Sequence, residues 1–144
     1  MAEKAREEST ENDVRQVAVG LARGAPPAQD VPISVQVRNG IRERWEYIKD
    51  PLPFEYVQAP EVSAWRIIHD GRAWGDCDDL SVFQAGILTA LGIPARFVAI
   101  GTRRGNGKYS HVFCEVKLMG DWYSMDHLVP HDADWLIVPL VKEV

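Results

Sequence analysis

The stretch Trp74-Gly75-Asp76-Cys77-Asp78-Asp79-Leu80-Ser81 decides how this chain is expected to fold, because a loop becomes a helix within it. Apolar residues beyond it recur at the spacing of one helical face: Leu80, Phe83, Ile87, Leu88 and Leu91. Asp76 is a suitable N-cap, and Gly92-Ile93-Pro94 predicts the end of the helix. Cys77, one of only two cysteines, therefore lies at the N-terminal end of a buried helical stripe.

This position favours a reactive thiol, because the thiolate is the nucleophilic form of cysteine. The partial positive charge at a helix N-terminus favours the thiolate, and the free amides there can bind a developing oxyanion. The carboxylates of Asp76, Asp78 and Asp79 oppose thiolate formation. Cys77 is therefore expected to need a cationic partner, and an imidazolium is the natural one.

Length and composition indicate one α+β domain. The chain has 144 residues, 46% of them hydrophobic, so residues 13–144 can share one core, while the charged residues 1–12 are expected to form a frayed or disordered tail. A net charge of -5 argues against nucleic-acid binding. No apolar run is long enough for a membrane span, and the first residues lack the apolar core of a signal peptide. A reducing, cytoplasmic location is expected.

The predicted elements place helices before strands. Helices are expected from Asp13 to about residue 23, from Asp30 to about Lys49, and from residues 59–61 to Asp70. The second would carry Val37, Ile41, Trp45 and Ile48 on one face. Beyond Pro94 the apolar period becomes two, which predicts strands at 96–100, 109–118, 122–126 and 135–138. The last is expected at a sheet edge because Pro139 follows it. This order is typical of α+β proteins.

His111 is the histidine for which a partner can be predicted. One face of its strand is apolar and carries Val112, Cys114, Val116 and Leu118. His111 lies on the other face. If residues 118–121 form the turn, Lys117 pairs with Trp122 in the next strand. His111 and Asp126 then become diagonal neighbours on one face, about 7–8 Å apart at Cβ, within reach of a hydrogen bond. A one-residue slip would separate them.

Metal sites are the less favoured interpretations. Zinc held by Cys77, His111, Cys114 and a loop histidine, His127 or His131, is disfavoured, since His111 and Cys114 point to opposite faces and a structural site needs four convergent ligands. Cys114 is expected to be a small buried hydrophobe. Calcium on the three aspartates beside Cys77 competes with simple helix capping, but calcium needs more oxygen ligands than they offer. No cofactor and no metal are expected.

Several segments, in this order, resemble the transglutaminase-like superfamily of papain-like thiol enzymes. They are Gly75-Asp76-Cys77-Asp78-Asp79, Leu91-Gly92-Ile93-Pro94-Ala95-Arg96, Ser110-His111-Val112 and Gly120-Asp121-Trp122-Tyr123-Ser124-Met125-Asp126. The segment from Asp50 to Pro60 resembles small bacterial and phage-type members, and bacterial transglutaminase-like cysteine proteases are also similar. The resemblance covers about residues 40–130. It implies a nucleophile-bearing helix packed on a three- to four-stranded antiparallel sheet, with a helical N-terminal region.

The resemblance implies a role for each residue of a triad. Cys77 would be the nucleophile, His111 the general base and then acid, and Asp126 the group that orients His111. The Cys77 backbone amide would be one oxyanion donor. Relatives often use an upstream Trp or Gln side chain as the second, and Gln58, Trp65 and Trp74 are the candidates here.

Three functions remain open. A thiol hydrolase, that is a peptidase, amidase or deamidase of protein or peptide substrates, is favoured because members without added domains more often resemble hydrolases. A transglutaminase would use a lysine amine in place of water. A non-enzymatic structural or adaptor module, such as a phage virion component, would keep the fold and assemble into a larger complex.

Overall fold

The computed structural model describes residues 1, 12–23, 33–51, 53–54, 56–102, 109–128 and 136–143, the last segment by its backbone only. Its elements are, in order, α2 (Asn12–Arg23), α3 (Ile33–Arg42), β1 (Trp45–Tyr47), α4 (Pro60–Asp70), β2 (Ala73–Gly75), α5 (Cys77–Ala90), β3 (Ala95–Thr102), β4 (Tyr109–Leu118), β5 (Asp121–Ser124) and β6 (Leu136–Glu143). Helices come before the main sheet, which confirms the predicted α+β class.

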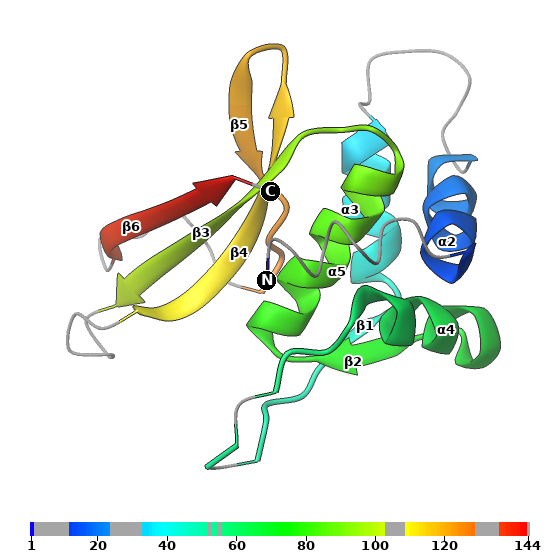
Figure 1. Cartoon of the computed structure of the whole chain (residues 1–144), viewed down its shortest axis with the longest axis horizontal. Coiled ribbons are helices and arrows are strands. Elements are labelled where there is room, and N and C mark those ends of the chain that lie inside the picture. Colours follow the sequence, from blue (N-terminus) through cyan, green and yellow to red (C-terminus); the bar gives the residue numbers. More distant parts are fainter. Residues whose placement is uncertain are drawn as a thin grey trace.

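The helix α5 is the centre of the fold (Figure 1). It contacts β3 and β4 on one side and α2, α3 and α4 on the other. Four residues of the predicted stripe, Leu80, Phe83, Ile87 and Leu88, are buried, whereas the fifth, Leu91, is the C-cap of the helix and only partly buried. Because both sides are covered, every residue from Asp79 to Leu88 is buried. Cys77 opens this helix, so the candidate nucleophile stands at the edge of the hydrophobic core.

The main sheet is antiparallel, with strand order β5-β4-β3-β6. The last strand lies at the edge, as predicted, although it runs further than residue 138. Lys117 pairs with Trp122, which confirms the predicted hairpin register. Met119 and Gly120 form the tight turn with φ of 52° and 90°, the positive values that a two-residue hairpin loop requires.

The prediction of one helix up to Lys49 was wrong. The helix α3 ends at Arg42, and Trp45 begins β1, which pairs in parallel with β2. The Trp45 ring stacks on Phe83 of α5, with the ring centroids 5.9 Å apart. Packing of this partly buried ring against the core and pairing of the backbone outweigh the helical spacing of the apolar residues. Val37 and Ile41 are buried, as predicted.

Other boundaries agree more closely. The first helix and α4 occur where they were predicted, and Gly71 ends α4 with a φ of 78°. The third predicted strand is shorter, because β5 stops at Ser124. Residues 2–11 of the expected tail lie outside the described residues, as do Asp30 and His131, and Asn12 already belongs to α2. Among the described helices, none is long and apolar enough to cross a membrane.

Candidate active site

Asp79 fixes the turn that leads into α5. Its side chain is buried, and its two carboxylate oxygens accept the backbone N–H of Asp76 at 3.2 Å and of Gln58 at 2.6 Å. Asp76 occupies the predicted N-cap position. A Cβ atom on Gly75 would overlap the Asp79 carboxylate. Gly75 and Asp79 therefore hold the start of α5 in place. This accounts for two residues of the stretch from Trp74 to Ser81.

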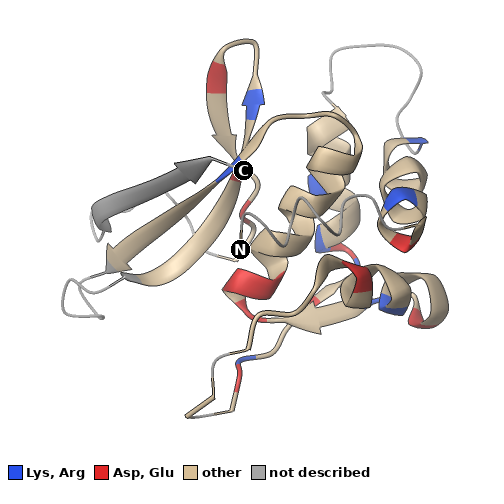
Figure 2. Ribbon diagram, viewed as in Figure 1, with Lys and Arg blue, Asp and Glu red and all other residues tan. Residues whose placement is uncertain are grey.

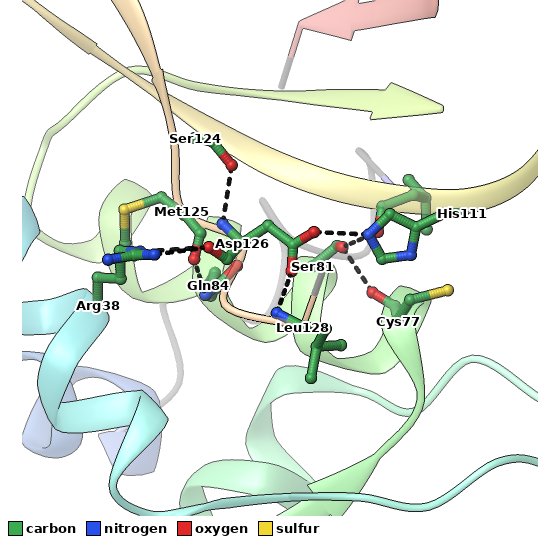
Figure 3. A network of polar contacts seen from close by, with 10 residues as sticks. Arg38, Cys77, Ser81, Gln84, His111, Ser124, Met125, Asp126 and Leu128 are labelled. Carbon is green, nitrogen blue, oxygen red and sulfur yellow. Dashed lines mark hydrogen bonds and ion pairs between the residues drawn. The ribbon is translucent and has the colours of Figure 1, made fainter. Parts of the chain in front are cut away.

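His111 and Asp126 are in direct contact (Figure 3). The distance from His111 Nε2 to Asp126 Oδ2 is 2.6 Å, and the two side chains are 9% and 1% exposed. The other carboxylate oxygen of Asp126 accepts the Leu128 N–H at 2.8 Å. The sequence prediction that strand alternation would bring this histidine and this aspartate together therefore agrees with the geometry.

Cys77 is the other partner of His111. Burial lowers the pKa of His111, but hydrogen bonds to the side chains of Asp126 and Cys77, together with the charges of both groups, raise it to about 9. Since Nε2 faces Asp126, the other ring nitrogen, Nδ1, is left for Cys77. A histidine held between a thiol and a buried carboxylate is the arrangement that nucleophilic thiol chemistry needs.

Three side chains that the sequence analysis did not select hold this arrangement (Figure 3). The Ser81 hydroxyl lies 2.6 Å from Cys77 O and 3.1 Å from Val112 O, so it joins the first turn of α5 to β4. Gln84 is fully buried and donates to Met125 O at 2.8 Å. Arg38 of α3 donates to Asp126 O through Nη2 at 2.8 Å. Polar residues inside an apolar helix were a usable signal for Ser81 and Gln84, whereas Arg38 gave none.

The predicted oxyanion donors lie around Arg66 of α4. The Gln58 amide nitrogen donates to Ser63 Oγ at 2.7 Å, and its oxygen accepts from Arg66 at 2.6 Å. The Arg66 guanidinium covers the Trp74 ring, 3.9 Å from its centroid. Trp65 is 49% exposed and packs on His69, 4.5 Å between ring centroids. The Gln58 side chain is thus held against α4, with one amide N–H donated to Ser63.

The ribbon at the start of α5 is acidic, as Figure 2 shows. The aspartates around Cys77 form a compact cluster, because Asp76, Asp78 and Asp79 each place an oxygen within 4.8 Å of the others. Burial, a hydrogen bond to Asp76 and the neighbouring negative charges raise the pKa of Asp78 to about 8. Both oxygens of Asp79 are already used by backbone N–H groups, so the cluster falls short of the six to eight ligands of calcium. Papain-like chemistry needs no cofactor, and we assign none.

Cys114 and His127 were the other candidate metal ligands. Cys114 is fully buried, as predicted, and burial raises the pKa of its thiol. Burial lowers the pKa of His127. The cysteines and histidines of the described segments form no metal cluster.

A cavity of about 390 Å³ lies between α3 and the β4–β5 hairpin, lined in part by Arg38 and Met125. None of Cys77, His111 and Asp126 lines it.

Comparison with known proteins identifies the family and the fold of the chain. A family model described as the transglutaminase-like superfamily matches residues 15–127. A crystal structure from Cytophaga hutchinsonii, described as that of "a Putative Cysteine Protease", has a TM-score of 0.61 at 19% identity. The match covers 89% of this chain but 42% of that one, so this chain spans less than half of that protein. No curated protein matches the chain.

Proposed function

Because the chain belongs to the transglutaminase-like superfamily, we propose that it is a thiol-dependent hydrolase that cleaves peptide or carboxamide bonds through Cys77, His111 and Asp126. The observation that carries the proposal is the 2.6 Å contact between His111 Nε2 and the buried carboxylate of Asp126, with Cys77 as the other partner of His111. An imidazole that only served packing would not need both partners.

Each residue has a chemical task in this proposal. His111 takes the thiol proton through Nδ1, and the thiolate of Cys77 attacks the carbonyl carbon of the substrate. The resulting oxyanion is bound by the Cys77 N–H, which has no acceptor within the helix because this residue is the first of α5. Collapse of the intermediate breaks the carbon–nitrogen bond, and His111 gives its proton to the departing amine. Water then hydrolyses the thioester.

Asp126 keeps the imidazole of His111 in the tautomer that the reaction needs. Its carboxylate accepts the Nε2–H, which fixes the tautomer whose Nδ1 can accept the thiol proton, and it stabilises the imidazolium that forms. The backbone of Asp126 is held in turn by Arg38, and that of Met125 by Gln84. These contacts support a rigid site, which efficient proton transfer requires.

Protein or peptide substrates are proposed because amide carbonyls are the electrophiles that this chemistry serves. Hydrolysis is favoured over transfer to an amine by the description of the Cytophaga hutchinsonii structure as a protease, although the likeness itself shows the fold alone. The same thioester can react with a lysine amine, so cross-linking remains an outcome of the test.

The test is incubation of the protein with a peptide library, alone and with an added primary amine, followed by mass spectrometry. Cleaved peptides identify a peptidase, deamidated glutamine an amidase, and amine adducts a transglutaminase. Cys77→Ala should abolish every such product, whereas Cys114→Ala, which removes the buried thiol, should retain them. Identical spectra for the wild type and Cys77→Ala would leave the non-enzymatic structural module as the better interpretation.

A further inference from the structure

The short parallel pair β1–β2 brings an unassigned tyrosine to the candidate nucleophile. Tyr47 lies opposite Gly75, two residues before Cys77. The pairing continues past the strand, because the Ile48 N–H donates to Gly75 O at 2.9 Å. The backbone of Tyr47 is therefore fixed against the segment that leads directly into α5.

Strand geometry gives the direction of the Tyr47 side chain. Successive side chains of a strand alternate between faces. Trp45 faces α5, where its ring stacks on Phe83, while Glu46 points the other way and forms an ion pair with Arg72 at 3.7 Å. Tyr47 thus shares the face of Trp45 and is displaced along the strand toward the start of α5.

The electrostatic surroundings of Tyr47 agree with this direction. Burial raises the pKa of its phenol, and the charges of Cys77, Asp76 and Asp78 raise it further. These charges act on the phenol because they are close to it. The hydroxyl therefore stays protonated at neutral pH and can donate a hydrogen bond. Tyr47 is 51% exposed, so a substrate can reach it.

We propose that Tyr47 is a catalytic residue whose hydroxyl donates the second hydrogen bond to the oxyanion. The inference rests on the function proposed for Cys77. When the sulfur–carbon bond forms, the carbonyl π electrons move to oxygen, and that oxygen accepts from the Cys77 N–H and the Tyr47 O–H. When the intermediate collapses, the electrons return to carbon, the leaving group departs, and Tyr47 keeps its proton.

Tyr47 fits this role better than the donors predicted from sequence. The Gln58 amide nitrogen already donates to Ser63. The Trp65 ring packs on His69 within α4, and the Trp74 ring lies under Arg66. Tyr47 combines a protonated donor, partial exposure and a backbone held beside the residues that precede Cys77.

The test compares two reactions of the same thiol. Acylation of Cys77 by p-nitrophenyl acetate passes through an oxyanion, whereas alkylation by iodoacetamide does not. Tyr47→Phe should slow acylation by about 100-fold to about 1,000-fold, because one oxyanion donor is lost, with alkylation unchanged. Tyr123→Phe is the matched control, because Tyr123 is also 51% exposed but lies in β5, and it should change neither rate.

The outcomes separate the two proposals. If the wild type is not acylated on Cys77, the proposed function fails and the role of Tyr47 fails with it. If the wild type is acylated and Tyr47→Phe is acylated equally fast, only the role of Tyr47 is overturned. Equal losses of acylation and alkylation would also overturn it, since Tyr47 would then act on the thiol. Thermal melting of each variant checks that the fold is intact.

Discussion

Asparagine in place of Asp126 would keep the size of the side chain and remove its charge. The carboxylate accepts from Leu128 N–H with Oδ1 and from His111 Nε2 with Oδ2. An asparagine has only one acceptor oxygen. If that oxygen accepts from Leu128 N–H, the amide NH₂ faces His111, so Nε2 must become an acceptor and the ring proton moves to Nδ1. This tautomer cannot take a proton from Cys77.

The size of the effect follows from the pKa of His111. A value of about 9, against the ordinary 6.5, corresponds to about 3 kcal/mol in favour of the imidazolium. The His111 side chain is only 9% exposed, so solvent screens little of this energy. Without the carboxylate, only the contacts with Cys77 oppose the effect of burial, which lowers the pKa of His111. The imidazolium that supports the thiolate is then less populated at neutral pH.

Alkylation of Cys77 by iodoacetamide between pH 5 and pH 10, followed by mass spectrometry, measures the effect. At pH 6.5, Asp126→Asn should slow labelling by about 10-fold to about 100-fold, and the two rates should converge near pH 10, where an ordinary thiol is ionised. Asp121→Asn, the same substitution at an exposed position of β5, should label like the wild type. Equal rates for Asp126→Asn and the wild type at pH 6.5 would refute the role of Asp126.

Three further predictions concern pH and packing. Hydrolysis by the wild type should decline as pH rises through about 9, where His111 loses the proton that the leaving amine needs; a rate that is flat from pH 7 to pH 10 would contradict this. Gly75→Ala should lower the free energy of unfolding, measured in urea, by about 2 kcal/mol or more, because the new Cβ overlaps the Asp79 carboxylate. The control Gly20→Ala has open space around its Cβ and should be neutral or stabilising. The folded-state pKa of Asp78, about 8, exceeds the unfolded value of 3.8, so ionisation of Asp78 weakens folding as pH rises from about 4 to about 8. Asp78→Asn should remove this loss and be more stable than the wild type at pH 8 by about 1–2 kcal/mol, a figure reduced for partial exposure. Equal pH dependence of both proteins in urea titrations would exclude this effect.

Local patterns in the sequence were sufficient for most of the fold. The stripe that begins at Leu80 predicted α5, and Gly71 marked the end of α4. The strand β1 could not be predicted in this way. Trp45 continues the helical spacing of Val37 and Ile41, and only its contact with Phe83 and its pairing with β2 show that it belongs to a strand. Such contacts come from distant parts of the chain, so they leave no periodic signal.

In the candidate site, too, residues related by local sequence could be predicted, whereas residues placed by tertiary packing could not. Strand parity within one hairpin was enough to predict that His111 and Asp126 would meet, because a two-residue turn links their strands. Arg38 could not be found, since α3 brings it to Asp126 through tertiary packing. The proposed donor Tyr47 could not be found either, since only the pairing of β1 with β2 places it opposite Gly75. The oxyanion donors predicted from the sequence were chosen by residue type, and residue type alone does not show that Gln58 is engaged with Ser63.

The order of the three candidate catalytic residues along the chain has a consequence for synthesis. Cys77 is made first, and Asp126, which holds His111, follows 49 residues later. In the proposed enzyme, the thiol would therefore lack its histidine and aspartate partners during translation, and it would gain them only after β4 and β5 have paired. In the proposed enzyme, a ribosome-bound chain would be inert toward its neighbours, and peptidase activity would first appear when the last hairpin closes.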